Sequence, residues 1–238
     1  MTRRLWIADR VAGSRAYLTG QNAAHLARVL RAKPGQQVDI AAEGISRSGT
    51  VVSVSDDQVE FELGGPVETA RLPEVLVVLS IYKFDRLEWA VEKLTELGVT
   101  TILPVVSRRT EPHLAKAADK RVERWRKIAR EAAQQSRRPV PPQIIAPALL
   151  KNVVQEAGGS RLVLSEIEEE RTLKSALNKC TLPLALAFGP EGGWTAEELE
   201  MFRDRNWVAA SLGGTILRAE TAAIAAVAVA MSEFSSRP

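Results

Sequence analysis

The sequence has little of the chemistry that cross-links a chain or binds metals. Its 238 residues include one cysteine, Cys180, and two histidines, His25 and His113. One cysteine cannot form a disulfide within the chain, and its isolation excludes a cysteine-rich zinc site. Two histidines also argue against a histidine-based metal centre, so we expect no metal.

Long hydrophobic runs are absent as well. Residues 1–6 contain no apolar stretch of the length that a signal peptide needs. The longest apolar run, Ala222–Met231, has ten residues and is mostly alanine, whereas a membrane-spanning helix needs about 20. We therefore expect a cytoplasmic protein without a membrane partner.

The net positive charge is small overall but concentrated in one segment. The net charge is only +3, yet residues 107–138 hold eleven Lys or Arg and four Asp or Glu. Such a local excess is typical of a surface that binds a polyanion. The alternative is a solvated helix face, where many charge runs lie. The size of the excess favours a polyanion.

The first 70 residues have the pattern of a small β domain. Short β-branched runs at 38–40 and 50–54, and the alternating run 59–63, predict strands. Glycines between them indicate turns. One helix is expected at about 22–30. Short strands with tight turns favour a small barrel.

After Pro66 and Pro73, apolar strands alternate with helices. This order predicts a parallel sheet covered by helices on both faces. The expected strands are 75–81, 101–106, 143–145, 161–164, 183–188 and 208–212, and the expected helices are 85–97, 116–136, 172–178, 195–206 and 219–234.

The expected helix 116–136 has an apolar face and a basic face. The apolar face, which should pack on the sheet, contains Val122, Trp125, Ala129 and Ala132. The basic face contains Lys120, Arg124, Lys127 and Arg130. Phosphate contacts fix RNA without reading its sequence. The residues expected to bind RNA are Arg28, Arg31, Lys33, Arg124, Lys127, Arg137 and Arg138.

Two glycine-rich turns, 188–195 and 211–221, each follow an expected strand. Ligands of open α/β sheets bind at the carboxyl ends of strands, where glycine permits close backbone approach. Neither turn has the spacing of a P-loop or of a dinucleotide-binding motif. Either turn alone is explained by a helix cap, since Thr195 and Glu198 fit a capping box. Two such turns within 30 residues favour a shared pocket.

These turns resemble those of the RsmE family, SPOUT-superfamily enzymes that methylate N3 of a uridine in 16S rRNA. The similarity extends over nearly the whole chain. The segments that carry it are Gly189–Trp194, Leu212–Ala222, Glu88–Val99, Arg124–Ser136 and His25–Arg31. At two points the family's glycine is replaced: its Lys-Gly-Asp is Lys83-Phe84-Asp85 here, and its Gln-Ser-Gly-Arg is Gln135-Ser136-Arg137-Arg138.

The resemblance implies a PUA-like RNA-binding β-barrel domain over 1–70 and a SPOUT methyltransferase domain over 73–238. The second domain would contain a parallel sheet, a C-terminal trefoil knot and the dimer interface of a homodimer. The implied cofactor is S-adenosylmethionine, and the implied partner is 16S rRNA or the assembled small subunit. The implied cofactor-binding residues are Leu164, Gly189, Glu191, Gly193, Leu212, Gly213, Ile216, Leu217 and Arg218.

Methylation of uracil N3 requires loss of its proton and leaves negative charge on the carbonyl oxygens. We expect Arg138 to stabilise that charge and Glu191 or Glu220 to accept the proton. Each carboxylate has an alternative role, as a helix cap or as a partner of Arg218. Such chemistry needs a single-stranded or flipped base.

Three other functions are compatible with parts of the pattern. The same fold could methylate a ribose 2′-hydroxyl, but the nearly end-to-end resemblance argues against this interpretation. A non-catalytic RNA-binding ribosome-assembly factor would not need the cofactor pocket. A metabolic α/β enzyme with a small acidic substrate would leave the β domain and the basic segment unexplained.

Overall fold

The computed structural model describes residues 4–235 and divides into two compact units. The first contains the described residues up to Arg71 together with Arg130–Pro141, and the second contains Leu72–Ala129 and the described residues from Pro142 onwards. The chain leaves the first unit after Arg71. It returns to that unit for residues 130–141, which the sequence had assigned to the second domain.

The first unit is built on a mixed six-stranded sheet in the order β1-β4-β5-β6-β3-β2. Its strands are β1 (Trp6–Ile7), β2 (Arg10–Ala12), β3 (Arg15–Thr19), β4 (Gln37–Ala42), β5 (Ile45–Val54) and β6 (Gln58–Pro66). All neighbours are antiparallel except β1 and β4. β1 and β2 form the two edges of this sheet, so the sheet is open and forms half of a barrel rather than a closed one. The strands β1, β2 and β3 were not predicted from the sequence.

The core of the first unit lies between this sheet and a short helical segment, α1 (Gly20–Ala24) continued by the π-helical turn η1 (His25–Val29). Trp6, Leu26 and Phe61 are fully buried there. A second, smaller cluster joins Leu5, Ile7 and Ala41 to Ala133. The segment 130–141 is thus packed into this unit by apolar side chains.

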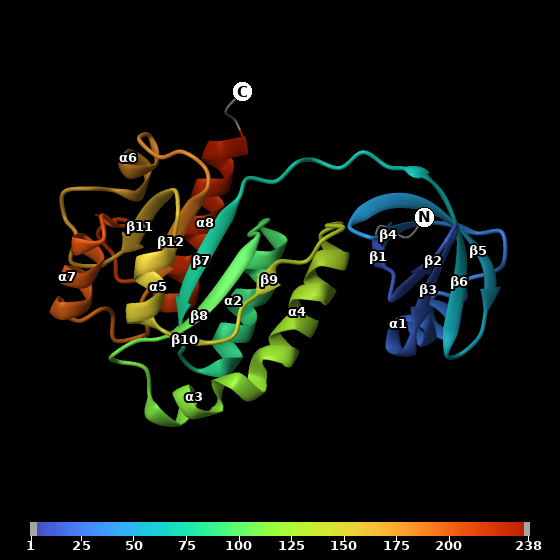
Figure 1. Cartoon of the computed structure of the whole chain (residues 1–238), viewed down its shortest axis with the longest axis horizontal. Helices are drawn as coiled ribbons and strands as arrows, with labels where there is room; N and C mark the ends of the chain where they lie inside the picture. Colours follow the sequence, from blue (N-terminus) through green and yellow to red (C-terminus); the bar gives the residue numbers. More distant parts are fainter. Residues whose placement is uncertain (1–3, 236–238) are drawn as a thin grey trace. The chain divides into compact units, whose positions relative to one another are not determined.

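The second unit contains a wholly parallel sheet in the order β10-β8-β7-β12-β11-β13, with β9 also paired to β8 (Figure 1). The strands are β7 (Val75–Ser80), β8 (Thr101–Val106), β9 (Gln143–Ile144), β10 (Ala148–Leu149), β11 (Ser160–Leu164), β12 (Leu184–Phe188) and β13 (Val208–Ala210). Its helices are α2 (Phe84–Glu96), α3 (Pro112–Ala117), α4 (Val122–Gln135), α5 (Leu150–Glu156), α6 (Leu173–Leu177), α7 (Ala196–Asp204) and α8 (Ala219–Ser235). The predicted parallel α/β architecture is confirmed.

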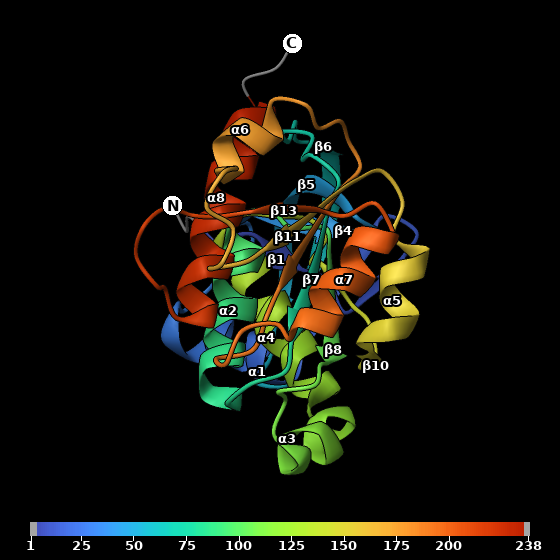
Figure 2. The same ribbon diagram turned by 90° about the vertical axis from the view of Figure 1, so that its left-hand side faces the viewer.

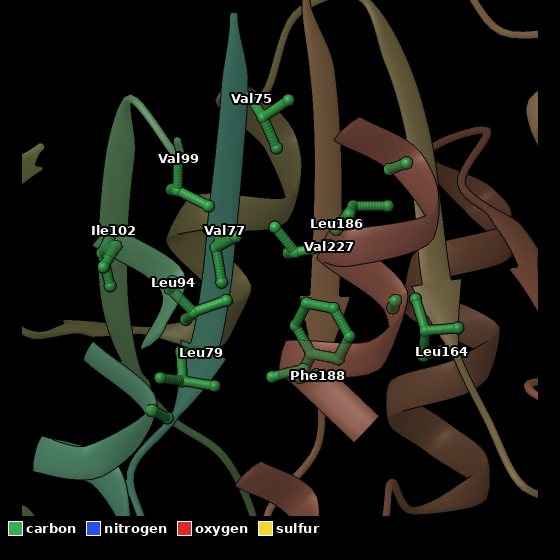
Figure 3. Packing of buried hydrophobic residues seen from close by; sticks show 14 of the residues in the cluster. Val75, Val77, Leu79, Leu94, Val99, Ile102, Leu164, Leu186, Phe188 and Val227 are labelled. Atoms are coloured by element: carbon green, nitrogen blue, oxygen red, sulfur yellow. The ribbon is translucent and has the colours of Figure 1, made fainter. Parts of the chain in front are cut away.

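Helices cover both faces of this sheet, as Figure 2 shows. Alternate residues of β7 point to opposite sides, so Val77 packs with α2 and α8 while Val78 packs with α5 and α7. Figure 3 shows the first of these cores, where Leu94 and Val227 meet the strands. Burial on both faces explains why the strands read as continuous apolar runs.

The expected helix 116–136 is interrupted. α3 ends at Ala117, and a 3-10 turn, η2 (Ala118–Arg121), precedes α4. The predicted apolar face is nevertheless correct, because Val122, Trp125, Ala129 and Ala132 are all buried. The last turn of α4 belongs to the first unit. Helix α5 was not predicted.

Candidate active site

A pocket opens at the carboxyl ends of β11, β12 and β13, with an empty volume of about 680 Å³ that includes its open mouth. The carboxyl edge of a parallel sheet is where open α/β folds bind small ligands. Its lining is part apolar and part backbone: Leu164, Ser165, Glu166, Phe188, Gly189, Pro190, Glu191, Gly193, Trp194, Ser211, Leu212, Gly213, Thr215, Ile216, Leu217, Ala219 and Ala222. Both predicted glycine turns contribute to the same pocket.

The first glycine turn follows β12 and is fixed by hydrogen bonds on several sides. Trp194 is buried and its Nε1 donates to the carbonyl of Leu164 at 3.0 Å. Gly193 has φ +70°, and a Cβ there would lie 2.2 Å from a carboxylate oxygen of Glu166. Only glycine fits this position without displacing its neighbours. The conformation of this turn is therefore fixed by its contacts with neighbouring residues.

The predicted capping box at the end of this turn is present. Thr195 accepts from the backbone N–H of Glu198, and the Glu198 carboxylate accepts from the backbone N–H of Thr195. The other oxygen of Glu198 accepts from the backbone N–H of Arg108, in the loop after β8, at 2.7 Å. The cap and the pocket are thus compatible functions of one turn.

The second glycine turn follows β13 and is much more open. Gly213 has φ +119°, and a Cβ there would meet no protein atom within 4 Å. The space beside it is the pocket itself. Ile216 is 87% exposed, and α8 starts immediately afterwards at Ala219.

Two arginines that sequence reasoning did not single out contact the first glycine turn. Arg86 of α2 lies 2.6 Å from Glu191 through Nη1 and Oε1, and 3.9 Å from Glu220 through Nε and Oε1. Arg109, after β8, donates to the carbonyl of Gly192. Both lie at the carboxyl edge of the sheet. Their position after β7 and β8 is the signal that could have suggested them.

Comparison with known families assigns both parts of the chain. Residues 70–231 match the family model described as an RNA methyltransferase domain, and residues 18–64 match an RNA methyltransferase PUA domain. The ribosomal RNA small subunit methyltransferase E of Bacillus subtilis is 33% identical over 88% of this chain and 87% of its own. The Mycobacterium bovis protein of the same name is 35% identical, over 90% and 85%. The chain belongs to the ribosomal RNA small subunit methyltransferase E family.

Solved structures extend the similarity to the fold. A family member from Neisseria gonorrhoeae bound to S-adenosyl methionine is 25% identical with a TM-score of 0.85, and the match covers 97% of each chain. A Legionella pneumophila protein described as a methyltransferase, with bound SAM, is 26% identical with a TM-score of 0.84 over 97% of this chain and 96% of that one. The chain is thus an RNA methyltransferase with an N-terminal PUA domain, as the resemblance implied.

The structure gathers most of the residues implied to bind the cofactor. Eight line the pocket: Leu164, Gly189, Glu191, Gly193, Leu212, Gly213, Ile216 and Leu217. Arg218 is exposed and is not among the lining residues. Glu220, implied as a possible base, is 4% exposed and also absent from the lining. Glu191 is therefore the candidate base that faces the pocket.

The residues predicted to bind RNA are exposed except Arg138, and Arg28, Arg124 and Arg137 pair with carboxylates. Arg28 pairs with Asp56 at 2.8 Å, and this interaction raises the pKa of Arg28. Arg124 binds Glu88, and Arg137 binds Asp39, both acids outside the basic segment.

The remaining predicted RNA contacts, Arg31, Lys33 and Lys127, are exposed. Arg130, expected on the same basic face, donates instead to the carbonyl of Ile7 and to Asp9. The basic segment is therefore less positive in the folded chain than its composition suggests.

Arg138 lies in the first compact unit, directly after α4. It is 7% exposed, and burial lowers its pKa to about 10. The backbone before it turns through Arg137, which has φ +61°. The N–H of Arg138 closes the turn on the carbonyl of Ala133 at 2.8 Å. This geometry is a Schellman motif, whose left-handed position favours glycine, which explains the glycine of the family pattern.

The other departure from the family pattern, Phe84, is used in packing. Its ring lies 6.1 Å from that of Trp125, and the guanidinium of Arg121 lies over it at 4.8 Å. Phe84 thus joins the start of α2 to α4. Both replacements of glycine have a local structural role.

Two further features concern membranes and metals. No helix among residues 4–235 has both the length and the apolar character needed to cross a membrane. Over the same residues, His, Cys, Asp and Glu side chains form no group suited to hold a metal ion.

Proposed function

We propose that this chain transfers a methyl group from S-adenosylmethionine to N3 of a uridine in 16S ribosomal RNA. The observation that carries the proposal is the convergence of both glycine turns on one pocket at the carboxyl edge of the parallel sheet. Membership of the family, over nearly the whole chain, supports the substrate class. The uridine and the N3 position rest on the resemblance.

The pocket suits the cofactor in shape and in chemistry. The space beside Gly213, which a Cβ would enter, allows a ligand to approach the backbone. Leu164, Leu212 and Leu217 provide an apolar wall for a flat base, and Glu191 provides a carboxylate. The bound cofactor supplies a methyl group on a positively charged sulfur.

The chain's own residues must remove a proton and stabilise charge. Glu191 lines the pocket and is the better placed acceptor for the N3 proton, whereas Glu220 is buried and does not line the pocket. Arg138, in the first compact unit, stays the candidate that the sequence offers for the negative charge that develops on the uracil oxygens. With a pKa of about 10, its guanidinium is charged at neutral pH.

The partners follow from the same function. Arg31 and Lys33 in the first unit and Lys127 in the second are exposed cations that would contact RNA phosphates, on naked rRNA or on the small subunit. We place the protein in the cytoplasm, where the ribosome is. The apolar residues Ile224 and Val229 of α8 are not fully covered within the chain, which favours a homodimer through this helix. The trefoil knot stays a prediction.

The proposal is tested by mass spectrometry of nucleosides from small-subunit rRNA of a strain lacking the gene. We expect 3-methyluridine to disappear, to return with the wild-type gene and to stay absent with Arg138→Ala. Loss of a 2′-O-methylated nucleoside instead would keep the fold and replace the target. If no modification changes while the purified chain still binds the RNA, a non-catalytic assembly factor replaces the methyltransferase.

A further inference from the structure

Arg86 joins three segments that are far apart in the sequence. It lies in the first turn of α2, contacts Glu191 in the first glycine turn and reaches Glu220 in the first turn of α8. The stronger contact, 2.6 Å between Nη1 and Oε1, spans 105 residues of chain. Three elements of the site are therefore linked through one guanidinium.

The contact lies at a particular point of the sheet. α2 follows β7, and the first glycine turn follows β12, the strand paired with β7. From β7 the chain passes to β8 on one side, and from β12 it passes to β13 on the other. Connections that leave adjacent strands in opposite directions open a crevice, and ligands of open α/β sheets bind there. The Arg86–Glu191 pair is located across this crevice.

The contact between Arg86 and Glu220 is important because Glu220 is buried. The Glu220 side chain is 5% exposed, and its Oε2 atom has no hydrogen-bond donor among the described residues. The hydroxyl of Tyr82 nearby is also buried without such a partner there, and burial, reinforced by Glu220, raises the pKa of this phenol. A neutral phenol does not offset the charge of a carboxylate. Arg86 does, which lowers the cost of a buried charge at the start of α8.

We propose that Arg86 is a positioning residue of the cofactor site. It orients Glu191 at the wall of the pocket and, through Glu220, fixes the start of α8 beside the first glycine turn. The role rests on the proposed methyltransferase function. Arg86 is not among the residues that line the pocket, so it acts through the two carboxylates.

The first test compares substitutions on one helix. Lys93 is also on α2, has the same 31% side-chain exposure as Arg86 and pairs with Glu92 and Glu96, neither of which lines the pocket. We expect Arg86→Gln to raise the Kd for S-adenosylmethionine about tenfold, the effect of roughly 1.4 kcal/mol. Arg86→Lys should recover part of this loss, and Lys93→Gln should leave the Kd unchanged. The measurement is isothermal titration calorimetry on the full chain.

A double-mutant cycle with Glu191→Gln decides whether the two residues act together. We expect the double variant Arg86→Gln/Glu191→Gln to bind the cofactor no more weakly than the weaker of the two single variants. Additive losses, or wild-type affinity in Arg86→Gln, would overturn the role of Arg86. If Arg86→Gln does not fold, Arg86→Lys takes its place in the same cycle. A wild-type chain that fails to bind S-adenosylmethionine would instead refute the proposed function.

Discussion

The two glycine turns line one pocket but are held in different ways. The first turn contacts Leu164 through Trp194, Arg109 through Gly192 and Arg86 through Glu191. In the second turn, residues 212–217 form no hydrogen bonds within the described part of the chain. One wall of the site is thus held in place by the rest of the fold, while the other is exposed.

The largest difference is expected when each turn receives one methyl group. In Gly193→Ala the Cβ would displace the flexible carboxylate of Glu166, and alanine at φ +70° costs about 1–2 kcal/mol. In Gly214→Ala the Cβ would meet nothing within 4 Å, and φ is not positive. We expect Gly193→Ala to weaken cofactor binding at least tenfold and Gly214→Ala less than twofold, measured by calorimetry. Equal losses would show that both turns are equally constrained.

A smaller effect is expected when the hydrogen bond of the Trp194 indole is removed. Trp194→Phe keeps an aromatic ring against Phe202 but removes the donor to the Leu164 carbonyl. A buried carbonyl left without its partner and a smaller ring should cost about 1–3 kcal/mol of the free energy of unfolding. Urea denaturation measures this cost. An unchanged midpoint would mean that the first turn does not depend on this bond.

Substitution of Ile216 in the second turn should affect cofactor binding rather than stability. Because its side chain is 87% exposed, Ile216→Ala should change the free energy of unfolding of the isolated chain by less than about 0.5 kcal/mol. We expect instead a several-fold rise in the Kd for the cofactor, because the side chain lines the pocket. Denaturation and calorimetry on the same variant separate the two effects. A large loss of stability would contradict the openness of this turn.

The smallest effect is expected at Arg137, a non-glycine residue in a left-handed turn. Arg137→Gly should gain about 1 kcal/mol from relief at φ +61° and lose a similar amount with the Asp39 ion pair. The thermal midpoint should therefore change little. Asp39→Asn, which removes the ion pair and leaves the backbone unchanged, is the matched control. A higher midpoint for Arg137→Gly would show that backbone strain dominates.

The parallel sheet and the pocket could be predicted because their signals are local. Continuous apolar runs identify strands buried on both faces, and glycines after β12 and β13 identify the turns. The strands β1 and β2, with two and three residues, are too short to show a period. Local pattern also reveals that Arg124 is exposed, but not that Glu88 binds it.

Contacts between distant segments account for the other differences. The apolar face of α4 predicts burial, yet it does not reveal that Ala133 packs with Leu5 and Ile7. Arg86 and Glu191 are separated by 105 residues, and no periodicity connects them. Their pairing follows only from the adjacency of β7 and β12. One sequence therefore indicates which side chains are available, whereas the order of the strands decides which of them meet.

The assignment of Arg130–Pro141 to the first unit restricts how the domains can be exchanged between relatives. In a chimaera that takes only the first 71 residues from another family member, those residues would have to pack against Ala133 and bond to Arg130 of this chain. The hydrogen bond from the backbone N–H of Leu5 to the carbonyl of Gln134 would have to form between segments from two different proteins. The first compact unit is therefore encoded in two separate stretches of the gene, so a single junction after residue 71 does not transfer the whole unit.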